Sequence, residues 1–166
     1  MKVHSRKLSE TDFQIMRELL LKEGPNEWNY ITNESVDHQF NLINQGRALA
    51  VVAEEVSIVG FAILIIKEAC PQKLGKYSVL SDIAYVNDVV VASSQSGKGL
   101  GCQLLKESIK LASNERCSRV YIERHEENMA SAGMMRKSGF ELVETFHDPN
   151  KRTTGSRNTS VLSICT

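Results

Sequence analysis

Apolar residues along this chain recur with two periods, one typical of helices and the other of strands. Helical spacing appears twice near the start, behind the capping residues of Ser9 to Asp12 and of Thr32 to Glu34. Two continuous apolar runs follow, Ala48 to Ala53 and Ile58 to Ile66, with a short polar stretch between them. Such runs predict an antiparallel hairpin, and Gly60 in the second run indicates a β-bulge. The first half therefore predicts two helices and a pair of strands.

The second half of the chain alternates between strand and helix patterns. A strand is expected from about Val79 to Val91, followed by a helix whose apolar stripe starts at Leu100. Another helix is expected after Asn128, which can cap it. The remaining strands are predicted at Val3 to Leu8, Arg119 to Glu123, Phe140 to Phe146 and Thr159 to Cys165.

The order of these elements indicates the fold class. It reads strand, two helices, three strands, helix, strand, helix and two strands, which predicts an α/β (α+β) fold with one mixed sheet and helices on both faces. A helix connects the fourth strand to the fifth, so that pair is expected to be parallel. With 166 residues and no linker or repeat, the chain is expected to form a single domain, residues 1–166.

Composition narrows the class of partner. The chain has 20 basic and 20 acidic residues and a formal net charge of zero, which gives no reason to expect a nucleic acid. No apolar run is long enough to cross a membrane, and the first residues lack the apolar core of a signal peptide. We therefore expect a soluble cytoplasmic protein with no membrane partner.

Cysteines and histidines are scattered along the chain. No two cysteines form a CxxC pair, and no histidine lies at metal-ligand spacing from a cysteine. Reduced thiols and no metal site are expected. The residues concerned are Cys70, Cys102, Cys117, Cys165, His4, His38, His125 and His147.

A glycine-rich loop lies between the predicted fourth strand and the helix after it. The loop reads Ser96-Gly97-Lys98-Gly99-Leu100-Gly101. Glycines let a ligand approach the main chain closely, and the N–H groups at a helix N-terminus bind anions such as pyrophosphate. Lys98 adds a positive charge nearby. A tight turn without a ligand stays open, whereas a nucleotide-binding P-loop is disfavoured because the Gly-Lys-Ser/Thr ending is absent.

Two motifs at the expected separation resemble those of the GNAT superfamily of acetyl-CoA-dependent N-acyltransferases. The first is the phosphate loop from Ser96 to Gly101, in which the glycines match but Ser96 stands where the family has Gln or Arg. The second is Asn128 to Phe140, an Asn-led helix that closes with Lys-x-Gly-Phe. The resemblance covers roughly Val79 to Phe146 and implies the GNAT fold, with about seven strands, four helices and splayed fourth and fifth strands.

The resemblance implies acetyl-CoA as co-substrate and no metal. The pantetheine arm is expected to pair with the backbone of Val89 to Val91, and the pyrophosphate to rest on N–H groups from Gln95 to Gly101. Asn128 is expected to organise the cofactor side of the cleft, although it can equally serve only as a helix cap. The candidate cofactor-binding residues are Val89, Val90, Val91, Ser96, Gly97, Lys98, Gly99, Leu100, Gly101 and Asn128.

Acetyl transfer from a thioester to an amine needs a neutral amine, a stabilised oxyanion and protonation of the thiolate. The family's usual oxyanion donor is a main-chain N–H of the fourth strand, here near Val89 or Val90. The family's usual acid is a tyrosine seven residues after the asparagine, where this chain has Met135. Methionine cannot donate a proton, so another group or solvent is expected to do so.

Several side chains are candidates for the missing proton transfers. Tyr85 and Tyr121 are candidate acids, and each can equally be a core aromatic residue. Asp88 is the candidate base, with a structural role as the alternative. The resemblance also leaves open that ordered water deprotonates the amine, as in many members of the family. The candidate catalytic residues are therefore Asp88, Val90 through its N–H, and Tyr121. His125 is of a residue type suited to proton shuttling, but it is expected to be a surface residue. The acidic cluster Glu123, Glu126 and Glu127 can attract a cationic amine, but it is expected to be a solvated charge run.

The resemblance implies an N-acetyltransferase that acts on a primary amine of a small molecule or peptide. The alternative is a non-catalytic acyl-CoA-binding module, which Met135 and Ser96 would suit. The acceptor is expected between the loops Gly24 to Thr32 and His147 to Asn158. Basic residues of the second loop suit an anionic group, or belong to a flexible loop; they are Lys151, Arg152 and Arg157. The sequence does not identify the acceptor, and it does not decide whether the protein forms a homodimer.

Overall fold

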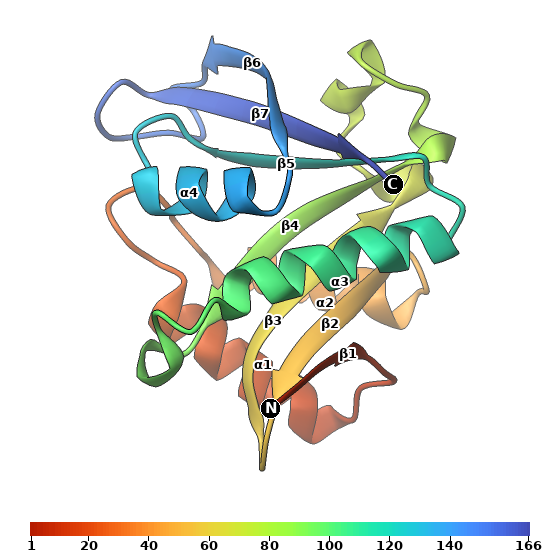
Figure 1. Cartoon of the computed structure of the whole chain (residues 1–166). Coiled ribbons are helices and arrows are strands. Elements are labelled where there is room, and N and C mark those ends of the chain that lie inside the picture. Colours follow the sequence, from red (N-terminus) through yellow and green to blue (C-terminus); the bar gives the residue numbers. More distant parts are fainter.

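The computed structural model describes residues 1–166 as one seven-stranded sheet with four α-helices (Figure 1). The strands are β1 (Lys2–Ser5), β2 (Ala48–Glu54), β3 (Ile58–Ile66), β4 (Ile83–Val91), β5 (Arg119–His125), β6 (Glu141–His147) and β7 (Asn158–Cys165). The helices are α1 (Glu10–Glu23), α2 (Asn33–Asn44), α3 (Leu100–Asn114) and α4 (Met129–Lys137). The predicted mixed sheet and the predicted order of elements are confirmed.

The sheet has the strand order β1-β2-β3-β4-β5-β7-β6, and only the β4–β5 pair is parallel. That pair is short: Ile83 to Val86 of β4 pair with Arg119 to Ile122 of β5. Both strands continue beyond these residues without pairing to each other. The predicted splay therefore begins directly after Val86 and Ile122.

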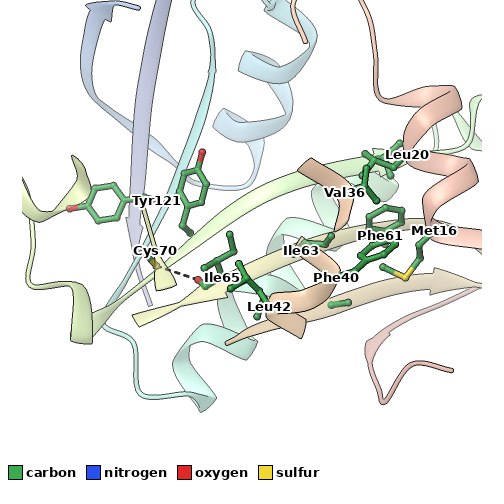
Figure 2. Packing of buried hydrophobic residues seen from close by; sticks show 14 of the residues in the cluster. Met16, Leu20, Val36, Phe40, Leu42, Phe61, Ile63, Ile65, Cys70 and Tyr121 are labelled. Atoms are coloured by element: carbon green, nitrogen blue, oxygen red, sulfur yellow. Dashed lines mark hydrogen bonds between the residues drawn. The ribbon is translucent and has the colours of Figure 1, made fainter. Parts of the chain in front are cut away.

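The first face of the sheet is covered by α1 and α2. Met16 of α1 and Val36 of α2 are fully buried and belong to one apolar cluster with Phe61 and Ile63 of β3 (Figure 2). Side chains alternate along a strand, so residues two apart in β3 point to the same face. This cluster fixes α2 against the sheet and so positions the polar residues that α2 carries.

The opposite face is covered by α3 and α4. Leu105 of α3 and Met135 of α4 pack in a second cluster with Leu64 of β3. Leu64 lies between residues of β3 that face the first cluster, as strand alternation requires. Both faces of β3 are therefore buried, which explains its continuous apolar run.

Both N-terminal helices begin with the predicted caps. The Ser9 hydroxyl accepts from the N–H of Asp12, and the Asp12 carboxylate accepts from the N–H of Ser9. At α2, Thr32 and Ser35 form the same reciprocal arrangement. These caps pair backbone N–H groups that the helix itself cannot satisfy.

Replacing the cap of α2 tests this part of the fold. We expect Thr32→Ala to lower the free energy of unfolding by about 1 kcal/mol, because the N–H of Ser35 loses its acceptor. Urea denaturation followed by circular dichroism measures the change. Thr153→Ala removes the same hydroxyl from an exposed position with no side-chain hydrogen bond and should leave the midpoint unchanged. Equal effects of the two substitutions would contradict the capping role.

Some predicted boundaries were wrong. β4 begins at Ile83, not Val79, because Leu80 to Asp82 form a 3-10 turn. Ser118, directly before β5, holds this turn: its N–H donates to the Asp82 carbonyl oxygen and its hydroxyl donates to the Asp82 carboxylate. β1 ends at Ser5, three residues early, and β5 continues two residues beyond Glu123.

The predicted bulge at Gly60 was one residue off. The register between β2 and β3 passes from Gly60 to Ile58, so Val59 is the extra residue. Gly60 instead allows close packing of β3 against β4, since a Cβ there would lie 3.0 Å from the Val90 carbonyl oxygen.

None of the helices has the length and apolarity needed to span a bilayer.

Candidate active site

A β-bulge in β4 sets the direction of the side chains beyond the parallel pair. The register with β3 shifts between Val86 and Asp88, which leaves Asn87 as the extra residue. One extra residue reverses the alternation of side chains along the strand. Asp88 consequently lies on the same face as Tyr85, and together with Gln39 of α2 they line one cleft.

Asp88 is a partly buried carboxyl group. Burial raises the pKa of Asp88 to about 6, while interactions with Gln39 and Lys151 oppose this shift. Gln39 is only 2% exposed, and its amide nitrogen donates to the Ser35 carbonyl oxygen at 3.3 Å. A carboxylate with a pKa near neutrality can accept a proton from an amine and release it again.

Asp88 stands where two clefts meet. One cleft of about 70 Å³ lies between the splayed strands and α4, and the other, of about 210 Å³, lies between the sheet, α2 and the β6–β7 connection. The residues that line both are Asn29, Asn87, Asp88 and Glu123. The first cleft is also lined by Val86, Val89, Ile122, Arg124, Asn128, Ser131, Met134 and Met135. The second is also lined by Tyr30, Ile31, Ser35, Gln39, Tyr85, Lys151 and Arg152.

The direction of the β4 amides follows from one backbone hydrogen bond. The N–H of Ala92 donates to the Val59 carbonyl oxygen at 2.8 Å, and the register between Phe61 and Val90 continues without a shift. In an antiparallel pair, alternate residues bond to the same neighbour. The N–H of Val90 therefore faces β3, and that of Val89 faces the splay.

The three valines expected to contact the cofactor lie in different surroundings. Val89 lines the cleft between the splayed strands, and Val91 lines the cleft beside the glycine loop. Val90 lines neither and is 4% exposed, with its side chain in the first apolar cluster. The strand alternation thus corrects the expectation that Val90 donates its N–H into the splay, and Val89 occupies that position.

The glycine loop adopts a conformation that requires glycine. Gly97 and Gly99 have φ of 78° and 74°, in the left-handed region. Gly99 is the N-cap of α3, and no side chain caps this helix. The first N–H groups of α3 therefore have no side-chain partner. A Cβ at Gly101 would lie 2.5 Å from the Met134 sulfur, so this glycine lets α3 approach α4 closely.

An open cleft of about 620 Å³ lies beside this loop and α4. It brings together most of the residues predicted to bind a cofactor. Val89, Val90, Lys98 and Asn128 do not line it. Within the glycine loop Lys98 is the exception, because its ammonium turns back to the Gln95 side-chain oxygen at 2.9 Å. The lining residues are Val91, Gln95, Ser96, Gly97, Gly99, Leu100, Gly101, Cys102, Met129, Ala130, Gly133, Met134 and Lys137.

Asn128 and Met135 both lie at the splay. Asn128 caps α4, since its side-chain oxygen accepts from the Ser131 N–H at 3.2 Å, and it also lines the cleft. Met135 lines the same cleft and is 3% exposed. Its thioether thus lies where the family has a tyrosine. One asparagine can thus serve as cap and as part of the cleft wall.

Arg124 is a cleft residue that the sequence patterns did not indicate. Its Nη1 donates to the carbonyl oxygens of His125 (3.1 Å) and Glu126 (2.6 Å), while its Nε is buried with no hydrogen-bond partner. Burial lowers the pKa of Arg124, yet a guanidinium stays charged at neutral pH. Arg124 is the cation among the residues that line the splay.

The two candidate tyrosines have different surroundings. Tyr121 is 2% exposed in the first apolar cluster, its hydroxyl lies 2.7 Å from the Ser78 hydroxyl, and it lines neither cleft at Asp88 (Figure 2). Tyr85 does line the second cleft, and its hydroxyl donates to Glu123 at 3.1 Å. The fold brings Tyr85, but not Tyr121, to Asp88.

Glu123 is a buried carboxylate that faces two exposed lysines. Its side chain is 1% exposed and pairs with the Lys73 ammonium at 2.8 Å, with the Lys151 ammonium 3.8 Å away. The expectation that Glu123 belongs to a solvated charge run was wrong, because β5 continues into the splay and turns this side chain inward. Glu126 and Glu127 instead bond Asn158 and the Ser156 N–H of the β6–β7 connection.

His125 is buried, which corrects the expectation of a surface residue. Its Nδ1 accepts from the Glu127 N–H at 3.0 Å, so Nε2 carries the proton and donates to the Thr154 carbonyl oxygen at 2.8 Å. Its ring packs against Trp28, with 4.6 Å between the ring centroids. His125 thus fastens the two loops that were expected to surround the acceptor.

Comparisons with known proteins bear on the family and the fold of this chain. A family model described as Acetyltransferase (GNAT) family matches residues 13–140. A curated relative, the uncharacterized N-acetyltransferase YobR of Bacillus subtilis (strain 168), is 30% identical over 79 residues, which are 48% of this chain and 32% of that protein. The match thus spans about a third of that relative's length.

Solved structures share the fold. A phosphinothricin acetyltransferase of the GNAT superfamily from Sinorhizobium meliloti, in complex with acetyl-CoA, superposes with a TM-score of 0.78 at 15% identity, over 99% of this chain and 89% of that one. The aminoglycoside acetyltransferase AAC(6')-Ib, in complex with coenzyme A and kanamycin, gives a TM-score of 0.73 at 18% identity, over 99% and 95%. At such identities the likeness establishes the fold.

Proposed function

This chain belongs to the GNAT acetyltransferase family, and from that membership we propose that it transfers the acetyl group of acetyl-CoA to a primary amine of a small molecule or peptide. The observation that carries the proposal is the position of Asp88, where the cleft between the splayed strands meets a second polar cleft. A thioester in the first cleft and an amine in the second would meet beside this carboxylate. Relatives of the same fold that are bound to coenzyme A or acetyl-CoA support the choice of donor.

The backbone supplies most of the cofactor site in this proposal. The uncapped N–H groups of α3 and the glycine loop hold the pyrophosphate, as expected for an anion at a helix N-terminus. Because these are main-chain contacts, Ser96 in place of Gln or Arg removes only one side-chain interaction. The pantetheine arm runs along the open edge of β4 toward Val89.

Val89 and Asp88 divide the chemistry between them. The Val89 N–H stabilises the negative charge that develops on the thioester carbonyl oxygen as the amine nitrogen attacks the carbonyl carbon. Asp88 accepts the proton that the amine loses, and collapse of the adduct expels the thiolate. Asp88 must be ionised to act, so its activity rises as the pH passes about 6.

Arg124 takes part of the role that tyrosine has elsewhere in the family. Met135 offers no proton, but the guanidinium of Arg124 places a positive charge in the wall of the same cleft. A positive charge near the sulfur favours a departing thiolate. Water then protonates the thiolate after it leaves.

The proposal is tested by two measurements on the intact protein. Acetyl-CoA should raise the melting temperature, since a ligand at about 100 times its Kd stabilises by about 2.7 kcal/mol. Release of free thiol from acetyl-CoA, measured with a chromogenic disulfide over a panel of primary amines, should depend on the amine. Stabilisation without thiol release on any amine would favour the alternative, a non-catalytic acyl-CoA-binding module, and absence of stabilisation would contradict both.

A further inference from the structure

Arg152 is a buried cation that the fold leaves largely unpaired. The residue is 5% exposed and lines the 210 Å³ cleft beside Asp88. Its Nε donates to the Thr159 hydroxyl at 2.9 Å, and this hydroxyl in turn donates to the Asp148 carboxylate at 2.7 Å. These two hydrogen bonds fix the Arg152 side chain at its Nε.

The outer part of the Arg152 guanidinium has no partner in the protein. A guanidinium has five N–H donors, and Arg152 makes one side-chain hydrogen bond and no ion pair. Glu123, the carboxylate across the cleft, already receives the Tyr85 hydroxyl and the Lys73 ammonium. The Nη atoms of Arg152 are not among the buried side-chain atoms without a partner, so they remain accessible from the cleft. The planar fork of arginine matches a carboxylate or a phosphate.

The opposite wall of the same cleft offers hydrogen-bond acceptors. Gln39 is 2% exposed, and its side-chain oxygen is buried with no hydrogen-bond partner. Asp88 lies beside it and lines the cleft as well. An amine is a donor that suits both oxygens. The cleft therefore presents Arg152 and Lys151 on the β6–β7 connection, and the unpaired Gln39 oxygen and the Asp88 carboxylate on α2 and β4.

We propose that Arg152 binds an anionic group of the acceptor, so that the acceptor is a small amine that also carries a carboxylate or a phosphate. This inference rests on the proposed function, because it places the acceptor's amine at Asp88. The size of the cleft agrees, since about 210 Å³ lies below the roughly 300–1,000 Å³ typical of sites for drug-sized ligands. A free amino acid or an aminoalkyl phosphate has this size and this pair of groups.

The test compares matched acceptors on the wild-type protein. Thiol release is measured with free amino acids against their carboxamides, and with aminoalkyl phosphates against the corresponding amino alcohols. We expect one anionic series to have kcat/KM at least about tenfold above its neutral counterparts, because a hydrogen bond between two charged groups is stronger than one to a neutral group. The series that shows the preference identifies carboxylate or phosphate as the group bound.

Substitutions then assign the preference to Arg152. Arg152→Gln should raise the KM of the anionic acceptor by about tenfold or more, with little change in kcat or in the KM of acetyl-CoA. Arg152→Lys keeps the charge but lacks the planar fork, so its KM for the anionic acceptor should lie between those of the wild type and Arg152→Gln. Arg157, which was expected together with Arg152 to suit an anionic group, is exposed and lines none of the three clefts described above, so Arg157→Gln should match the wild type.

The outcomes separate this inference from the proposed function. Equal kcat/KM on anionic and neutral amines, or an equal effect of Arg152→Gln on both, would overturn the role of Arg152 and leave acetyl transfer standing. Absence of thiol release with every amine would overturn the proposed function and this inference with it. Retained stabilisation by acetyl-CoA shows that each variant is folded.

Discussion

Replacing Asp88 by asparagine is expected to lower kcat/KM for the amine roughly 100-fold or more. Asparagine keeps the size of the side chain but cannot accept the amine's proton. Binding of acetyl-CoA should be unchanged, because the cofactor contacts lie on the Val89 side of β4 and in the glycine loop. Thiol release measured over a range of amine concentrations separates the two effects.

The pH dependence distinguishes a base from a merely structural carboxylate. Burial raises the pKa of Asp88 from 3.8 to about 6, so the wild-type kcat/KM should rise with pH through about 6 and the asparagine variant should lose this limb. Asp37→Asn removes an exposed carboxylate of α2 and should keep the wild-type profile. An unchanged limb near pH 6 in the Asp88→Asn protein would contradict the role of Asp88 as base.

The raised pKa of Asp88 also predicts that stability falls over the pH range in which activity rises. The folded state binds the Asp88 proton more tightly than the unfolded state does, so the wild type loses stability as the pH rises from 3.8 to about 6. Asp88→Asn removes this buried negative charge. We therefore expect the variant to melt at a higher temperature than the wild type at pH 8, with a smaller difference at pH 4.

A side chain at Gly99 is expected to weaken acetyl-CoA binding at least about tenfold, or by about 1.4 kcal/mol. Gly99 has φ of 74°, which a β-branched residue adopts only with strain, and it begins α3 at the proposed pyrophosphate site. Gly99→Val should therefore shift the start of α3 and misdirect its N–H groups. The dissociation constant is measured by titration with acetyl-CoA.

Gly75→Val is the matched control for Gly99→Val. Gly75 has no positive φ, has open space at its Cβ position and lies in a 3-10 turn outside the clefts at Asp88 and the glycine loop. It should bind acetyl-CoA as the wild type does. If Gly99→Val kept the wild-type affinity while remaining folded, the glycine loop would not hold the pyrophosphate.

Features set by neighbouring residues were predicted well from the sequence. The capping boxes at Ser9 and Thr32 depend on contacts within four residues, and the hairpin of β2 and β3 depends on two adjacent apolar runs. The parallel β4–β5 pair followed from the helix between the strands. These signals are local, so the fold class could be inferred without a structure.

Features that depend on distant pairing could not be predicted. The bulge at Asn87 arises from the register between β3 and β4, and it decides which face Asp88 joins. The burial of Arg152 and His125 depends on how the β6–β7 connection packs over the sheet, and nothing in its polar sequence indicates that packing. Gln39 was hidden for the same reason, since a glutamine in an amphipathic helix looks like a solvated residue.

The central claim is that acetyl transfer occurs at the splay of β4 and β5, beside Asp88. A crystal structure of the protein with coenzyme A tests it most directly. The account predicts the pyrophosphate on the N–H groups of Gly97 to Gly101, and the thiol between the splayed strands near the Val89 N–H and Asp88. A coenzyme A molecule whose thiol lies outside the gap between β4 and β5 would contradict it.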